Sequence, residues 1–121
     1  MFVEDEESGG TTVLRLAGIV KVGETVRELE SRLERISEEQ IGSVILDMTD
    51  LEYMDSTTLG VLVGALHRFK SQNRDLALVH PRDRIAALLR VANLDSLFHI
   101  YRTVGEALAA MKQSEEDTGG N

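Results

Sequence analysis

Apolar and polar residues follow two patterns along the chain, one typical of amphipathic helices and one typical of buried strands. Residues 24–38 carry apolar side chains at steps of three and four positions, which places them on one face of a predicted helix. These side chains are Val26, Leu29, Leu33 and Ile36. Residues 43–48 (SVILDM) are instead a nearly continuous apolar and β-branched run, which predicts a central strand covered on both faces.

The same two patterns predict the remaining elements. An opening hairpin joins Phe2–Val3 to a strand at residues 11–20 through a glycine-containing turn. Further strands are predicted at residues 76–80 and 97–102, and further helices at about 56–71, at 82–93 and from Thr103 onward. The order β-β-α-β-α-β-α-β-α indicates an α/β fold with a mixed, mostly parallel sheet and about four helices.

The pattern extends over residues 1–112, which we expect to form one domain. Residues 113–121 (QSEEDTGGN) are polar, acidic and rich in glycine, so we predict a disordered acidic tail. The chain has 13 basic and 21 acidic residues and a formal net charge of -8. This charge disfavours nucleic acid and anionic membranes as partners and favours proteins with basic patches.

Composition also disfavours several classes of site. The chain has no cysteine, which excludes disulfides and thiolate metal sites, and His67, His80 and His99 show no metal-ligand spacing. We therefore predict no metal and no cofactor. The N-terminal segment is acidic, unlike a signal peptide, and no apolar run approaches the roughly 20 residues that span a bilayer. We expect a cytoplasmic protein that does not insert into a membrane.

Four polar residues, Asp55, Ser56, Thr57 and Thr58, stand directly before a long apolar segment. Asp, Ser and Thr are preferred helix N-caps, so a simple cap is one interpretation. A binding or modification site is the other, because strand-to-helix connections of parallel sheets commonly carry sites and a helix N-terminus stabilises phosphate. Ser56 lacks the G-x-S-x-G context of a hydrolase nucleophile, so we do not expect an enzyme.

Gly60 and Gly64 lie four positions apart in the predicted helix. The favoured interpretation is close packing of the helix on the sheet, and the alternative is a small-residue surface that a partner approaches closely. Asp47, Asp50 and Asp55 are not expected to form a metal site, because Asp47 falls in a predicted strand and Asp50 in the loop after it.

Residues 44–64 (VILDMTDLEYMDSTTLGVLVG) resemble the signature of the STAS family, and more narrowly that of the bacterial anti-sigma factor antagonists. In those proteins a V-I-L-D-L strand and a short loop lead into M-D-S-S-G-L-G-V or M-D-S-T-G-L-G-V at the start of a helix. The predicted order of elements agrees with the family fold over residues 1–112. Outside the signature, the resemblance is mostly one of hydrophobic pattern.

The resemblance implies a mechanism and partners. An antagonist of this family binds an anti-sigma factor that is also a serine kinase, which releases the sigma factor, and a serine phosphatase resets the phosphorylated antagonist. Carried over to this chain, the phosphoacceptor is Ser56, with Thr57 as a second candidate. The partner-binding residues are Asp55, Ser56, Thr57, Thr58, Gly60 and Lys21. A monomer that presents one docking face is the expected state.

Two positions depart from the family pattern. Thr58 stands where relatives usually have glycine, and Lys21 replaces the acid of a G-E-L-D segment after the second strand. These departures motivate an alternative function, a non-switching STAS scaffold in a sensory assembly or beside a transporter. A small enzyme with Ser56 as nucleophile is a more remote alternative.

Overall fold

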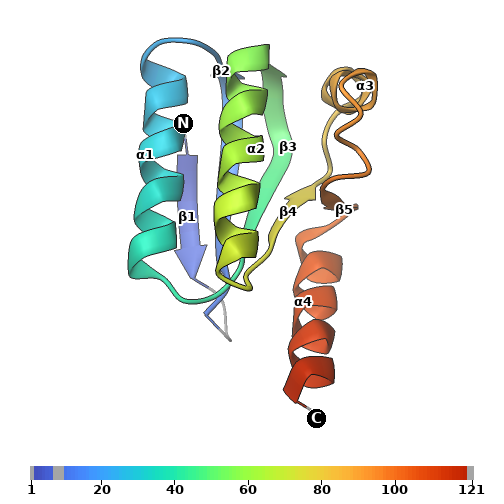
Figure 1. Ribbon diagram of the computed structural model, residues 1–121. Coiled ribbons are helices and arrows are strands. Elements are labelled where there is room, and N and C mark those ends of the chain that lie inside the picture. The colour runs from blue at the N-terminus through green and yellow to red at the C-terminus, as the bar shows by residue number, and fades with distance from the viewer. Residues whose placement is uncertain (1, 7–9, 120–121) are drawn as a thin grey trace.

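The computed structural model describes residues 2–6 and 10–119. Within these residues, five strands and four helices follow in the predicted order (Figure 1). The strands are β1 (Phe2–Glu6), β2 (Thr12–Val20), β3 (Val44–Met54), β4 (Leu76–Val79) and β5 (His99–Tyr101). The helices are α1 (Glu24–Glu39), α2 (Ser56–Ser71), α3 (Asp83–Val91) and α4 (Val104–Gly119). The predicted α/β fold is therefore confirmed.

The strands form one sheet in the order β1-β2-β3-β4-β5. β1 pairs antiparallel with β2, and the other neighbouring strands are parallel. β1 and β5 are therefore the edges, and β3 is the central strand, as its apolar sequence predicts. Because β2 and β3 are parallel, their carboxyl ends point in the same direction, and α1 and α2 both begin at this carboxyl-terminal end of the sheet.

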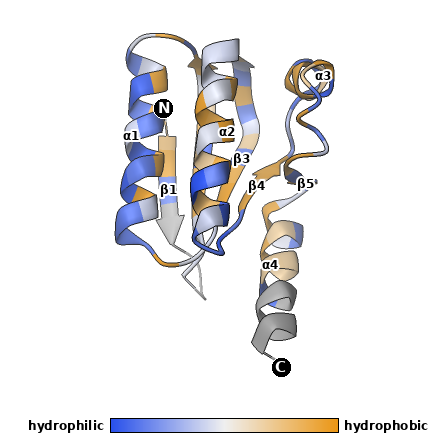
Figure 2. Cartoon of the chain, in the orientation of Figure 1, coloured by the Kyte–Doolittle hydropathy of each residue, from blue (hydrophilic) through white to orange (hydrophobic). Residues whose placement is uncertain are grey.

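Two apolar clusters lie on opposite faces of the sheet. Successive side chains of β3 alternate between them: Val44 and Leu46 belong to the larger cluster and Ile45 to the smaller one. The larger cluster is covered by α1 and α2, which lie side by side in Figure 1, and by α3. The smaller cluster is covered by α4. In Figure 2 the visible side of α1 is largely hydrophilic, whereas β4 is hydrophobic throughout.

β3 is longer than predicted. We expected a strand at residues 43–48 followed by a loop, but β3 continues to Met54 and includes Asp50, which pairs with Ala17. The second half of β3 carries mostly exposed polar residues, so its sequence does not show a strand pattern. Its Leu51 and Met54 side chains are buried and pack on the core. Two register shifts in the β2–β3 pairing, typical of β-bulges, accompany this extension.

Other boundaries differ by smaller amounts. β1 extends to Glu6, beyond the predicted Phe2–Val3, because its register with β2 continues to the Glu6–Thr12 pair. β5 is shorter than the predicted 97–102, because the Leu97 amide donates to the Leu94 carbonyl in the turn after α3. α4 continues to Gly119, past the predicted domain end at residue 112. Residues 120–121 lie outside the described residues, and the disorder of the acidic tail stays a prediction.

Arg74 joins the carboxyl-terminal ends of α1 and α2. Its Nε donates to the Gly42 carbonyl at 2.8 Å, and its two Nη atoms donate to the carbonyls of Ser37 at 2.8 Å and Ile36 at 3.2 Å. The guanidinium also lies 4.4 Å from the centre of the Phe69 ring. One cation thus joins the last turn of α1, the loop that follows it and the end of α2, and burial lowers the pKa of Arg74.

Candidate docking and phosphorylation site

Asp55 connects β3 to α2 and caps the helix. Its backbone is extended, with φ -97° and ψ 179°, and its Oδ1 accepts a hydrogen bond from the Thr58 amide at 2.9 Å. This geometry satisfies one of the amides that a helix N-terminus leaves without an intrahelical partner. The predicted cap is therefore confirmed.

The second oxygen of Asp55 holds a different segment. Oδ2 accepts a hydrogen bond from the Val22 amide at 2.8 Å, in the connection between β2 and α1. The pKa of Asp55 is lowered from its ordinary value because the amides of Val22 and Thr58 donate to its ionised carboxylate. One carboxylate therefore fixes the start of α2 against the neighbouring loop.

Thr58 adds a buried link between the same two segments. Its side chain is 1% exposed, and its Oγ1 lies 3.0 Å from the Val20 carbonyl oxygen and 2.8 Å from Asp55 Oδ1. A hydroxyl has one proton, so it is shared between these two acceptors. Thr58 thus acts from inside the fold, which corrects its place in the predicted partner-binding set. The side chain of Thr58 therefore adds no bulk to the exposed surface around Ser56.

Ser56 and Thr57 lie on the surface, on the first turn of α2. No described residue hydrogen-bonds to the Ser56 hydroxyl. Ser56 lines a small pocket of about 140 Å³ between the start of α2 and α3. The pocket is otherwise formed by Tyr53, Met54, Asp55, Arg84, Ile85 and Leu88. The residue predicted as phosphoacceptor is therefore accessible, and its neighbour Asp55 is held in place.

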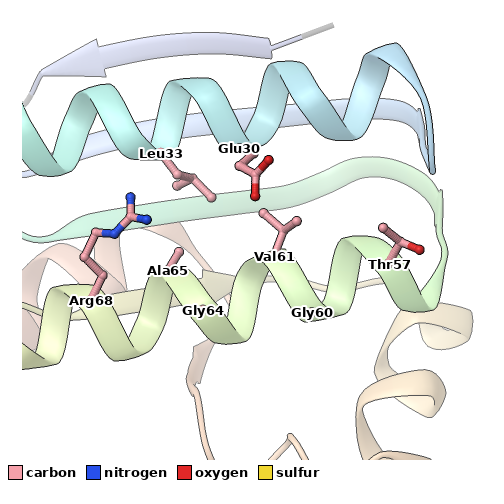
Figure 3. A pocket seen from close by; sticks show the side chains of 8 residues that line it. All are labelled: Glu30, Leu33, Thr57, Gly60, Val61, Gly64, Ala65 and Arg68. Atoms are coloured by element: carbon pink, nitrogen blue, oxygen red, sulfur yellow. The ribbon is translucent and has the colours of Figure 1, made fainter.

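Thr57 faces another hollow, a groove of about 310 Å³ between α1 and α2 (Figure 3). Gly60 and Gly64 lie along it and are exposed, and a Cβ at either position would meet no atom of another element within 4 Å. The favoured prediction, that these glycines bring α2 close to the sheet, is therefore wrong. Buried α2 residues such as Leu62 and Phe69 pack on the core instead. Figure 3 shows Glu30 reaching toward α2 from α1.

Lys21 lies in the connection between β2 and α1, beside Val22, and is exposed. Three large apolar residues near the carboxyl ends of β2 and β3 are exposed as well. The exposed fraction is 52% for Ile19, 68% for Val22 and 41% for Tyr53. Ile19 and Tyr53 are cross-strand partners. Sequence reasoning missed Ile19 because an apolar residue in a predicted strand resembles a core residue, and it missed Tyr53 because the second half of β3 was predicted as a loop. It missed Arg84 because nothing local links α3 to Ser56.

The described residues contain no group of three or more His, Cys, Asp or Glu side chains that could hold a metal ion. Asp47 accepts instead from Thr49 and lies 3.6 Å from Arg15. Among the helices that the structure describes, none is long and apolar enough to cross a bilayer.

Comparison with curated proteins identifies relatives that match 54–63% of the chain. The chain is 40% identical over 65 residues to a Thermotoga neapolitana protein provisionally named as an anti-sigma factor antagonist homologue, a match that covers 54% of this chain and 58% of that protein. It is 33% identical over 76 residues to the anti-sigma-B factor antagonist of Staphylococcus aureus, covering 63% of this chain and 70% of the relative. The chain thus spans less than two thirds of the first of these relatives.

Solved structures share the fold over almost the whole chain. An anti-sigma-factor antagonist (STAS) domain protein from Planctomyces limnophilus matches with a TM-score of 0.82 and 22% identity, over 92% of this chain and 97% of that one. The Bacillus cell fate determinant SpoIIAA in its phosphorylated form matches with a TM-score of 0.74 and 18% identity, over 91% and 98%. The STAS domain family model matches residues 2–107. The chain therefore belongs to the STAS domain family.

Proposed function

We propose that this protein is an anti-sigma factor antagonist: it binds an anti-sigma factor and thereby frees a sigma factor for transcription in the cytoplasm. The observation that carries the proposal is the contrast at the start of α2. The side chains of Asp55 and Thr58 are engaged in hydrogen bonds within the chain, whereas the Ser56 hydroxyl is exposed beside a pocket and engages no described residue. The names of the Thermotoga and Staphylococcus relatives support this role.

Phosphorylation of Ser56 by the anti-sigma factor, acting as a serine kinase, is the proposed switch. It adds about -1.5 to -2 charges at neutral pH. The amides and dipole at the start of α2 favour this charge, although the neighbouring carboxylate of Asp55 opposes it. We therefore expect the fold to persist and the docking surface to change. The likeness to a structure of phosphorylated SpoIIAA supports a fold that accommodates the modification.

In this proposal the protein is a binding partner and not an enzyme. A serine nucleophile needs an adjacent base, and none of the described residues hydrogen-bonds to the Ser56 hydroxyl. The transfer of phosphate is performed by the kinase, and its removal by a serine phosphatase. The docking surface consists of Asp55, Ser56, Thr57, Gly60 and Lys21, presented by a single copy of the chain.

The test compares Ser56→Ala and Ser56→Asp with the matched control Thr57→Ala, using the anti-sigma factor kinases encoded in the same genome. Ser56→Ala should bind the cognate kinase and resist phosphorylation, and Ser56→Asp should bind at least tenfold more weakly. Thr57→Ala should be phosphorylated at Ser56, as measured by phosphopeptide mapping. If Ser56→Ala were phosphorylated as fully as the wild type, Ser56 would not be the switch.

A non-switching scaffold is the competing role, and the exposed Lys21 favours it, because a lysine replaces the acid of the family pattern. Thr58 no longer favours it, since its side chain is buried. Purification from native cells with bound proteins separates the two roles. An anti-sigma factor kinase in the complex supports the antagonist, whereas a transporter or a large sensory assembly supports the scaffold.

A further inference from the structure

The pocket beside Ser56 is also lined by a cationic side chain, Arg84, which has no role in the proposed function above. Arg84 belongs to the first turn of α3 and lines the same 140 Å³ pocket as Ser56. No hydrogen bond or ion pair joins its guanidinium to any described residue. Arg82, two positions earlier, differs: its Nε donates to the Thr49 carbonyl at 2.9 Å. Of these two arginines, Arg84 is therefore the one available to a new anion at Ser56.

Among the residues that line the pocket, Arg84 is the one cation available to an anion at Ser56. Tyr53, Met54, Ile85 and Leu88 contribute a largely apolar lining, which offers a phosphate few hydrogen-bond donors. The other ionised group in the lining is the Asp55 carboxylate, which repels a phosphate. A guanidinium binds phosphate through two parallel N–H···O hydrogen bonds, a geometry that a single surface ammonium cannot offer.

We propose that Arg84 receives the phosphate of phosphorylated Ser56 in an ion pair within the same chain. The ion pair lies across the pocket and covers its apolar lining. A partner side chain that enters this pocket in the unmodified protein is then excluded by the chain's own phosphoserine and arginine. Release of the partner follows without unfolding of α2 or α3. This inference rests on the proposed function in one respect, that Ser56 is the residue phosphorylated.

Three charged groups near the site could compete with or disturb this ion pair. Asp55 opposes the phosphate in every variant and is left unchanged in the test. Asp83 precedes Arg84 on α3 and is exposed. Lys21 lies in the β2–α1 connection, where the Val22 amide bonds to Asp55, and is the alternative cation for the phosphate. The experiment must therefore separate Arg84 from Lys21.

The second pKa of the phosphoserine reports the nearby cation directly, because a cation favours the dianion over the monoanion. Phosphoserine is placed at position 56 during translation, so no kinase is needed, and the phosphate is titrated by phosphorus NMR. Arg84→Gln should raise this pKa, which is about 6 for free phosphoserine, by about 0.2–0.7 units, the range of an exposed ion pair. Arg82→Gln, the matched control, should leave it unchanged.

Two results would overturn the assignment: an unchanged pKa in Arg84→Gln, or a larger rise in Lys21→Gln than in Arg84→Gln. Urea unfolding of each unmodified variant checks that the fold is retained, as expected for exposed side chains. Failure here is distinguishable from failure of the proposed function. A kinase that ignores Ser56 removes the switch and leaves the titration result standing, whereas an unchanged titration leaves phosphorylation intact and removes Arg84 as its receiver.

Discussion

Thr58 is buried in the first turn of α2, and its hydroxyl is expected to contribute measurably to stability. Thr58→Val keeps the shape of the side chain and removes the hydroxyl. The Val20 carbonyl and Asp55 Oδ1 then lose a donor at 3.0 and 2.8 Å. Because one proton serves both acceptors, the loss is counted once.

The magnitude follows from burial. A typical hydrogen bond contributes about 0.5–1.5 kcal/mol, and a buried group left without its partner costs about 1–3 kcal/mol. Thr58 is 1% exposed, so Thr58→Val should lower the free energy of unfolding by about 1–2 kcal/mol. Thr58→Ser keeps the hydroxyl and loses one methyl group, about 0.8 kcal/mol. Thr58→Gly loses both and adds a glycine to the helix, about 2–4 kcal/mol in total.

Urea unfolding followed by circular dichroism measures these differences. With a slope of about 2 kcal/mol/M, the middle of the range for a small domain, Thr58→Val should move the midpoint by about 0.5–1 M toward lower urea. The order of stability should be wild type, then Thr58→Ser, then Thr58→Val, with Thr58→Gly lowest. A Thr58→Val variant as stable as the wild type would refute the structural role assigned to the hydroxyl.

Two further predictions concern Arg74 and Asp55. Arg74→Ala should lower the free energy of unfolding by about 2–4 kcal/mol, because it removes charged hydrogen bonds to three carbonyls and the contact with Phe69. The free energy of unfolding of Arg74→Lys should fall between those of Arg74→Ala and the wild type. A loss below about 0.5 kcal/mol in Arg74→Ala would contradict the stabilising role assigned to the Arg74 contacts. The pKa of Asp55 is lowered in the folded state, so its contribution to stability is present above its ordinary value of 3.8 and is lost as the pH falls through the lower folded value. The stability difference between the wild type and Asp55→Asn should therefore shrink below pH 3.8, and the Val22 amide signal in NMR should titrate with it; a pH-independent difference would refute the carboxylate's role.

The order of elements could be predicted from the sequence because periodic apolar residues mark α1 and a nearly continuous apolar run marks the first half of β3. The second half of β3 could not, since its exposed polar residues resemble a loop and only pairing with β2 keeps it extended. Asp55 could be predicted as a cap from residue type alone. Its bond to the Val22 amide could not, because the two residues are separated by 33 positions.

The direction of side chains at the site was the least predictable property. Gly60 and Gly64 suggest close packing in any helix, but which face of α2 they occupy depends on how the helix is rotated against α1 and the sheet. The rotation that buries Leu62 and Phe69 turns both glycines outward. The same rotation turns the hydroxyl of Thr58 inward to Val20. Arg84 joins the site only because α3, which packs on β3, lines the same pocket as the start of α2.

The open edge of the sheet at β1 has a consequence for how copies of this protein meet. An edge strand offers unpaired backbone groups that another strand can use, which is a common route to aggregation. Three of the five residues of β1 (FVEDE) are acidic. Although Glu4 forms ion pairs with Arg32 and Arg35 of α1, pairing of this acidic strand with the same strand of a second copy is disfavoured at low ionic strength. The strand that completes the sheet therefore also discourages its continuation into a second molecule.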